Sequence, residues 1–334
     1  MDINLQTISQ HSSEIFHQLR WNGQICCPVC GSIHIYNPNP EQLHICADCN
    51  TRFSDTSGTI FHATKLPLSK WLYAIYLFLT SSRGISSYAL ARYIKVTQTT
   101  AWTMLMKLRS CLHRDIKFDS TDVVAIDEVY VGANWSYIPS HKKFAKATPP
   151  PQHWNLNQKE TKEYYKKQFM ELAAQDKMPV LGLVSLESPK ISLTYIPSSN
   201  RQEFVRDQLR CHLGQTMNQM FVDTPQIVVT DQSKLYHFLD DELDHNNRHK
   251  FDHQVCRHDL SKYASKDGYS SNRLEAAFSH LRRAWRGIYT RWSRTYVQLY
   301  LDEFCFRYNN PLSSKTVILD RIKEFFRWVD PRVC

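Results

Sequence analysis

The chain has 334 residues, of which 42% are hydrophobic and 12% aromatic, and these fractions exclude a wholly disordered polypeptide. Its net charge of +9 at pH 7 favours a polyanionic partner. The longest apolar run, Trp71 to Leu79, is shorter than the ~20 residues of a transmembrane helix, so we expect no membrane span. Four of the ten cysteines lie in CxxC pairs, and we expect no signal peptide, which together favour a reducing compartment, the cytoplasm.

Residues 26–61 are rich in Cys, Pro, Asn and Thr and lack long periodic runs, which is typical of a small module organised by a metal. Two CxxC pairs are separated by 15 residues, a spacing that indicates a zinc ribbon. Two such turns close a tetrahedral sulfur shell without an open position, so we predict a structural Zn²⁺ ion. We assign residues 1–64 to an N-terminal arm and this ribbon. The predicted ligands are Cys27, Cys30, Cys46 and Cys49.

Residues 65–117 carry apolar side chains at helical spacing, which predicts three helices. Ser86 or Ser87 is expected to cap one helix and Thr97 the next, with a short turn between them. This pattern is typical of a helix-turn-helix, whose second helix presents polar side chains to base edges and phosphates. A helical hairpin that packs on the following domain is the alternative. The predicted DNA-contacting residues are Gln98, Thr99, Thr100, Thr103 and Lys107.

Residues 118–334 alternate short buried strands with amphipathic helices, which predicts an α/β domain. A basic, Pro-containing insertion at about 134–178 interrupts this domain and is partly helical. The expected strands are 123–126, 180–184, 191–195 and 227–229, and the expected helices lie near 159–174, 201–213, 271–286, 294–308 and 314–328.

Two aspartates follow apolar runs of this domain directly, Asp127 after residues 123–126 and Asp231 after residues 227–230. Carboxylates that follow neighbouring strands of an open sheet converge at one edge. Glu275 lies on the flank of the buried stripe of the helix 271–286 and is the third candidate. Carboxylate oxygens suit Mg²⁺ or Mn²⁺, and two such ions promote phosphodiester chemistry by activating the attacking oxygen and stabilising the leaving one.

The same helix carries basic side chains, since Arg282 and Arg286 share the flank of Glu275. With Arg283 they are predicted to contact DNA. Arginines, tryptophans and tyrosines are interleaved from residue 273 to 294, a composition suited to phosphates and stacked bases. A solvated basic helix is the alternative.

Short sequence motifs contain or flank these candidate residues between positions 27 and 309. They are CPVCGS at 27–32, DEVYVG at 127–132, TD at 230–231, NRLE at 272–275, RGIY at 286–289 and YLDEFCFRYN at 300–309. Together they resemble the bacterial insertion-sequence transposases that join an N-terminal zinc ribbon to a DDE-type, ISXO2-like catalytic domain. The resemblance implies an RNase H-like mixed sheet flanked by helices, with Asp127, Asp231 and Glu275 as the triad.

In that family the third position varies, so Asn272, or His258 before the helix, is an alternative third ligand. The resemblance further implies excision and strand transfer of a DNA element with terminal inverted repeats, using two Mg²⁺ or Mn²⁺ ions. The expected partner is double-stranded DNA, both element ends and target, bound by a homo-oligomer that is at least a dimer at the nucleoid. The insertion at 134–178 is longer and richer in Pro than the family pattern. A domesticated regulator without catalysis and a nuclease that never joins ends are the alternatives.

Overall fold

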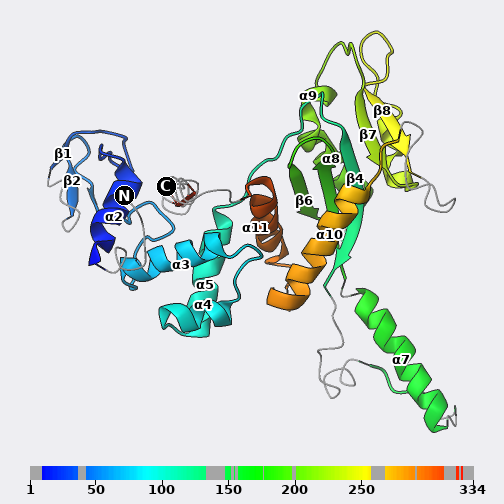
Figure 1. Cartoon of the computed structure of the whole chain (residues 1–334), viewed down its shortest axis with the longest axis horizontal. Helices are drawn as coiled ribbons and strands as arrows, with labels where there is room; N and C mark the ends of the chain where they lie inside the picture. Colours follow the sequence, from blue (N-terminus) through cyan, green and yellow to red (C-terminus); the bar gives the residue numbers. More distant parts are fainter. Residues whose placement is uncertain are drawn as a thin grey trace. The chain divides into compact units, whose positions relative to one another are not determined.

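The computed structural model describes residues 10–36, 43–132, 147–151, 154, 157–175, 177–197, 201–256, 268–289, 292–311, 321–322 and 325. The chain forms two compact units, residues 1–113 with 310–334 and residues 114–309. The division expected from the sequence, at residues 1–64, 65–117 and 118–334, stays a prediction. The helices and strands of both units carry the labels of Figure 1.

The first unit begins with a short helix and a small three-stranded sheet of order β1-β2-β3, in which both neighbouring pairs are antiparallel. The buried residues of the apolar cluster at the ribbon are Trp21, Cys27, Cys46 and Phe53. So few buried side chains are too small a core to fix a fold alone, which agrees with a module organised by a metal. The elements are α2 (Ser12–Trp21), β1 (Ile35–Tyr36), β2 (His44–Cys46) and β3 (Arg52–Phe53).

Three helices follow, α3 (Leu68–Thr80), α4 (Ser87–Ile94) and α5 (Gln98–Ser110), as the periodicity predicts. Ser86 caps α4 by accepting a hydrogen bond from the Ala89 N–H group, and Thr97 caps α5 by accepting one from Thr100. Between the two helices Lys95 adopts a left-handed conformation with φ of 52°. The helices and their caps are therefore confirmed, whereas a DNA-binding role of this module stays a prediction.

The second unit is built on a mixed sheet of five described strands in the order β6-β5-β4-β7-β8 (Figure 1). The central strand β4 runs antiparallel to β5 and parallel to β7, and β7 runs parallel to β8. The strands are β4 (Val124–Val131), β5 (Met178–Ser185), β6 (Ile191–Tyr195), β7 (Gln226–Thr230) and β8 (Phe251–Val255).

Helices cover the two faces of this sheet, and alternate residues of β5 show which helix lies on which face. Leu181 and Leu183 belong to a buried cluster that includes Val205 and Leu209 of α8, whereas Gly182 between them meets α10. A mixed α/β sheet flanked by helices is thus confirmed, consistent with the RNase H-like expectation. The helical elements are α7 (Gln158–Gln175), α8 (Arg201–His212), α9 (Gly214–Met217), η3 (Lys234–Leu239), α10 (Asn272–Ala284), the π-helical η5 (Trp285–Tyr289) and α11 (Val297–Asn309).

Two strands differ from the sequence prediction. The strand expected at 123–126 extends to Val131, because β4 pairs with β5 along its whole length, so Asp127 lies inside the strand and not after it. The edge strand β8 was not predicted, since its sequence FDHQV is largely polar and lacks an apolar run. The helix expected at 314–328 lies mostly outside the described residues. None of the helices in the described part of the chain is long and apolar enough to cross a membrane.

Candidate active site and metal centre

Four cysteine side chains of the ribbon meet at one point. The Sγ atoms of Cys27 and Cys49 are 3.6 Å apart, those of Cys30 and Cys46 are 3.5 Å apart, and all four lie within 4.8 Å of one another. Cys27 and Cys46 are buried, whereas Cys30 and Cys49 are exposed. A closed set of four sulfur ligands fits a structural Zn²⁺ ion, as the paired spacing predicts.

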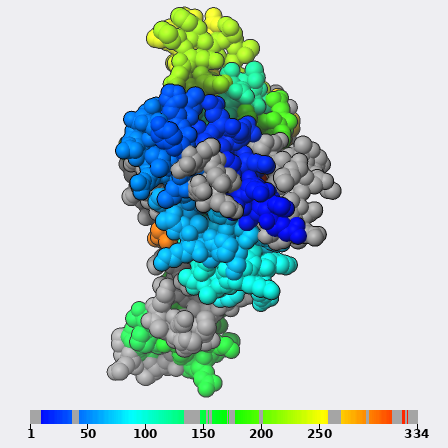
Figure 2. Space-filling view, turned by 90° about the vertical axis from the view of Figure 1, so that its left-hand side faces the viewer, coloured from blue at the N-terminus to red at the C-terminus, as the bar shows by residue number. Residues whose placement is uncertain are grey.

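A buried carboxylate, Asp55, joins α2 to the ribbon, and sequence reasoning missed it. Its Oδ2 atom lies 2.9 Å from His17 Nδ1, and its Oδ1 atom lies 2.8 Å from His44 Nε2 and 2.7 Å from the indole nitrogen of Trp21. Three donors thus satisfy a carboxylate that is 6% exposed. Figure 2 shows α2, in dark blue, at the surface beside the ribbon that these contacts attach it to.

Two of the predicted DNA-contacting residues of α5 make contacts within the first unit. Gln98 Nε2 donates to Ser87 Oγ at 2.8 Å, which ties α5 to α4. Lys107 Nζ donates to the carbonyl oxygen of Ile60 at 3.0 Å, which ties α5 to the end of the ribbon. These two side chains therefore have structural partners in this conformation.

The three threonines of α5 differ in exposure. Thr99 and Thr103 are exposed, and the Thr103 hydroxyl donates to the Thr99 carbonyl at 3.0 Å. Thr100 is half-buried, with its hydroxyl 2.8 Å from that of Thr97. Of the five predicted side chains in α5, Thr99 and Thr103 thus present the most open surface.

The two candidate aspartates follow the pairing of β4 with β7 at the same distance along the chain. The parallel pairing ends at Ala125 opposite Val229. Asp127 and Asp231 each come two residues later, Asp127 inside β4 and Asp231 directly after the end of β7. Asp127 accepts a hydrogen bond from the next backbone N–H at 2.6 Å, and Asp231 accepts one from the Ser233 N–H at 3.0 Å.

The helix that carries Glu275 approaches the sheet over a glycine. Gly182 pairs with Asp127 across β4 and β5, and a Cβ atom at Gly182 would lie 2.6 Å from Phe278 Cε1 and 3.1 Å from Leu274 Cδ1. Only glycine therefore lets α10 lie this close to the sheet beside Asp127. Glu275, in the first turn of α10, is exposed and accepts a hydrogen bond from Ser271 Oγ at 3.2 Å.

The three candidate acids do not form a closed ligand group among the described residues. In the described part of the chain, Asp127, Asp231 and Glu275 are not among the groups of ligand atoms within 4.8 Å of one another. The alternative third ligand Asn272 is exposed at the start of α10, and His258 lies outside the described residues. The identity of the third ligand therefore stays a prediction.

Basic side chains surround a cavity of about 420 Å³ beside the ends of β4 and α10. Arg282 and Arg286 line it together with Lys177, whereas Arg283 does not and instead donates to the Ser279 carbonyl. The sequence prediction grouped the three arginines, and the structure separates Arg283 from the other two. The remaining lining residues are Glu128, Tyr130, Val131, Gly132 and Trp285.

Two further side chains beside the aspartates carried no sequence signal that we could interpret. Arg201, at the start of α8, forms an ion pair with Glu128 and donates to the Tyr130 hydroxyl at 2.9 Å. Tyr236 in η3 is 1% exposed, and burial together with the charges of Asp127 and Asp231 raises the pKa of its hydroxyl. The contacts of Arg201 join segments more than 70 residues apart in the sequence, so only the fold reveals them.

The chain matches two protein-family models that agree with this architecture. Residues 9–52 match the transposase zinc-ribbon domain, and residues 121–309 match the ISXO2-like transposase domain. The fold and the sites thus define a transposase with a zinc ribbon. Because the second match covers more than half of the chain, the protein belongs to the ISXO2-like transposase family.

A relative from Halobacterium salinarum, described as an uncharacterized protein in transposable element ISH50, is 26% identical over 141 residues. The alignment covers 40% of this chain and 45% of the relative, so the chain matches less than half of that protein's length. No solved structure matches the chain.

Proposed function

We propose that this protein is a DDE-type transposase that cuts DNA at the ends of an insertion element with terminal inverted repeats and joins them to target DNA. The observation that supports the proposal is the parallel pairing of β4 with β7, which ends two residues before Asp127 on one strand and two residues before Asp231 on the other. The relative from an ISH50 element and the two family matches support the same class of reaction.

Asp127 and Asp231 would hold two Mg²⁺ or Mn²⁺ ions, with Glu275 as the third ligand. The donor set fits these ions because it consists of hard carboxylate oxygens. Bound ions of this kind activate an attacking oxygen and stabilise the leaving oxygen of a phosphodiester. A backbone N–H group donates to one carboxylate oxygen of Asp127 and another donates to one of Asp231, and these bonds fix the orientation of the two side chains.

DNA would be held by both units. Arg282, Arg286 and Lys177 line the cavity at the ends of β4 and α10 and can contact the phosphates of a double-stranded substrate. Glu128 also lines this cavity. Its negative charge is paired with Arg201, so it repels DNA phosphates less than an unpaired carboxylate would. The ribbon and α5 would recognise the element ends, with Thr99 and Thr103 as the most exposed candidates. A homo-oligomer, at least a dimer on DNA at the nucleoid, is part of this proposal.

The proposal is tested with Asp127→Asn and Asp231→Asn in a Mg²⁺-dependent assay of cleavage and joining on oligonucleotides that carry the element ends. Amides bind Mg²⁺ poorly yet keep the shape of the side chain, so each variant should lose about 10³-fold or more in rate. DNA binding, measured by mobility shift, should stay close to that of the unchanged protein. Asp252→Asn is the control, because this exposed aspartate lies on the edge strand β8.

Other outcomes separate the alternatives. Cleavage without joining by the unchanged protein would indicate a nuclease, and specific binding without cleavage would indicate a regulator. Either aspartate variant with full activity would contradict the site. For the third ligand, Glu275→Gln should remove activity while Asn272→Ala mainly reduces it, and the reverse ranking would move the ligand to Asn272.

A further inference from the structure

The edge strand β8 carries a histidine whose ring lies between two other polar side chains. His253 Nδ1 lies 2.8 Å from Asp240 Oδ1, and His253 Nε2 lies 2.7 Å from the hydroxyl oxygen of Thr230. The His253 side chain is 3% exposed, and Thr230 is 0% exposed. Because an ionised carboxylate only accepts hydrogen bonds, Nδ1 donates to Asp240. This bond fixes the orientation of the ring and directs Nε2 at Thr230.

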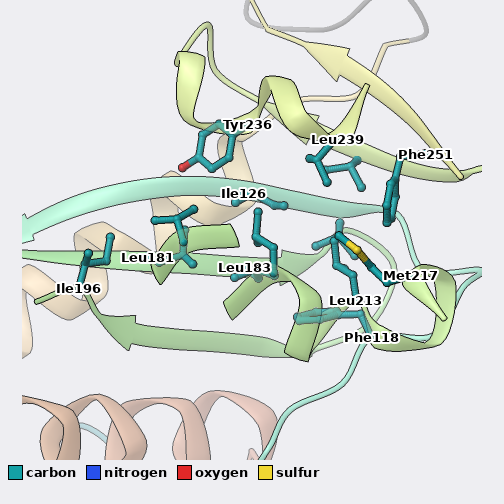
Figure 3. Close-up of a cluster of buried hydrophobic side chains, with 14 residues drawn as sticks. Phe118, Ile126, Leu181, Leu183, Ile196, Leu213, Met217, Tyr236, Leu239 and Phe251 are labelled. Carbon is teal, nitrogen blue, oxygen red and sulfur yellow. The ribbon is translucent and has the colours of Figure 1, made fainter. Parts of the chain in front are cut away.

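The packing of η3 on the sheet brings these three residues together. Thr230 is the last residue of β7, and Asp240 directly follows η3. Leu239 of η3 and Phe251 of β8 belong to the same buried cluster, and Figure 3 shows both side chains in it. Phe251 and His253 are two residues apart in β8, so their side chains lie on the same face of the sheet. That face is the one that η3 covers.

His253 thus contacts both ends of the segment that carries Asp231. This segment leaves β7 at Thr230, continues through η3 and ends at Asp240. Thr230 Oγ1 also lies 2.9 Å from the carbonyl oxygen of Asp231, and the Asp231 carboxylate accepts a hydrogen bond from the Ser233 N–H group inside the segment. A shift of either end of the segment would therefore change the position of the Asp231 carboxylate.

The polar character of these positions needs an explanation, because apolar side chains could fill the same buried space without hydrogen-bond partners. A buried polar network whose members are all paired holds one geometry more strictly than apolar contacts do. His253 and Thr230 are therefore suited to hold the end of β7 in one position. This also gives a reason for the polar sequence of β8, which concealed the strand from sequence analysis.

We propose that His253 is a positioning residue, which holds the end of β7 through Thr230 and thereby orients Asp231 for a divalent cation. The inference rests on the proposed function, since it assumes that Asp231 is a metal ligand. Groups that orient metal-ligating residues typically change metal affinity by roughly 10- to 100-fold when they are removed. We expect the lower end of this range, because His253 acts on the ligand through a second residue.

The test uses His253→Ala and Thr230→Val in the full-length protein, singly and together. Mn²⁺ affinity is measured by titration calorimetry and by the electron paramagnetic resonance signal of free Mn²⁺. Each single variant should lose roughly 10-fold in affinity, and the double variant should lose no more than either, because both changes break the same contact. His253→Gln, whose amide can reach the Thr230 hydroxyl, should restore part of the loss.

His249→Ala is the matched control. His249 is exposed, and its Nδ1 atom lies 3.0 Å from the backbone carbonyl oxygen of Asp240, so the variant also removes an imidazole next to this aspartate. It should leave Mn²⁺ affinity unchanged. Thr230→Val keeps the shape of the side chain and removes only its hydroxyl, so it remains informative if His253→Ala does not fold.

Each other result has a defined meaning. If Asp231→Asn loses Mn²⁺ binding while Thr230→Val and His253→Ala bind Mn²⁺ like the unchanged protein, the positioning role is overturned and the metal site stands. A lower melting temperature with unchanged Mn²⁺ affinity would make the network structural only. Losses that add in full in the double variant would overturn the link between the two residues. If Asp127→Asn and Asp231→Asn bind Mn²⁺ normally, the proposed metal site is wrong and this inference fails with it.

Discussion

The ribbon and the five-stranded sheet hold their functional side chains in place by different means. The apolar cluster of the ribbon has four members, of which two, Cys27 and Cys46, are also the predicted metal ligands. The sheet rests on a cluster of fourteen buried residues that includes none of the three candidate acids. In the ribbon, two of the predicted metal ligands are themselves part of the apolar cluster. In the second unit, the apolar cluster supports the sheet, and the proposed metal ligands lie outside that cluster. The two regions should therefore respond differently to the same kinds of perturbation.

Removing the metal should have the largest effect and should affect the ribbon alone. Structural zinc contributes about 10 kcal/mol or more to the folding of small domains, so chelation or Cys46→Ser should unfold residues 25–53. Amide hydrogen exchange of β4 and β5 should be unchanged. Cys26→Ser is the control, since Cys26 is exposed and outside the sulfur cluster. Folded protein that never contained zinc would contradict the comparison.

Asp55→Ala should have the next largest effect, again in the first unit. It leaves the buried rings of His44 and Trp21 without their acceptor, and the loss should be about 3 kcal/mol in the free energy of unfolding. Denaturant unfolding followed by tryptophan fluorescence measures it. Asp48→Ala removes an exposed carboxylate 3.3 Å from His34 and should destabilise the protein much less than Asp55→Ala does. Equal losses for both variants would show that the Asp55 network does not stabilise the ribbon.

Gly182→Ala should have a moderate effect confined to the sheet. The added Cβ atom would lie 2.6 Å from Phe278, so α10 must shift. This shift should lower the free energy of unfolding by about 2 kcal/mol. Because α10 carries Glu275, catalysis should fall by more than the loss of stability explains. Gly287→Ala is the control, since a Cβ atom there meets nothing within 4 Å. A Gly182→Ala protein with full stability would mean that the helix does not depend on this close approach.

The smallest effects concern DNA contacts of the second unit. Arg282→Ala should weaken binding across all sequences and reduce the slope of log affinity against log salt by about one unit. Arg283→Ala, one residue away but outside the cavity, should change the slope less. If both variants keep the salt slope of the unchanged protein, α10 is a solvated basic helix. DNA binding would then depend mainly on the first unit.

The sequence was most informative where function depends on local spacing. The CxxC pairs predicted the sulfur cluster, and the polar residues before two apolar stretches predicted the caps at Ser86 and Thr97. Asp231 was expected after a strand and directly follows β7. These features depend on residues within a few positions of one another, where propensity and spacing decide the structure.

Contacts between distant segments were not predictable in this way. The Asp55 network spans 38 residues, and the Arg201–Glu128 pair spans more than 70. Asp127 was expected at a strand end because the apolar run stops before it, but pairing with β5 continues the strand to Val131. The partners of Gln98 and Lys107 were also missed. Helical periodicity shows which side chains face away from the apolar stripe, but it does not show which other segments they contact.

The composition of the sulfur cluster gives the ribbon a chemical vulnerability that the sheet does not share. Cysteine side chains bind zinc only as thiolates, and they release it when they are protonated or oxidised. Cys30 and Cys49 are exposed to solvent. Acid or peroxide should therefore release the ion and melt the ribbon, while the apolar core of the sheet keeps the aspartates in register. Under oxidative stress the protein would keep its proposed catalytic site and lose the module proposed to recognise the element ends.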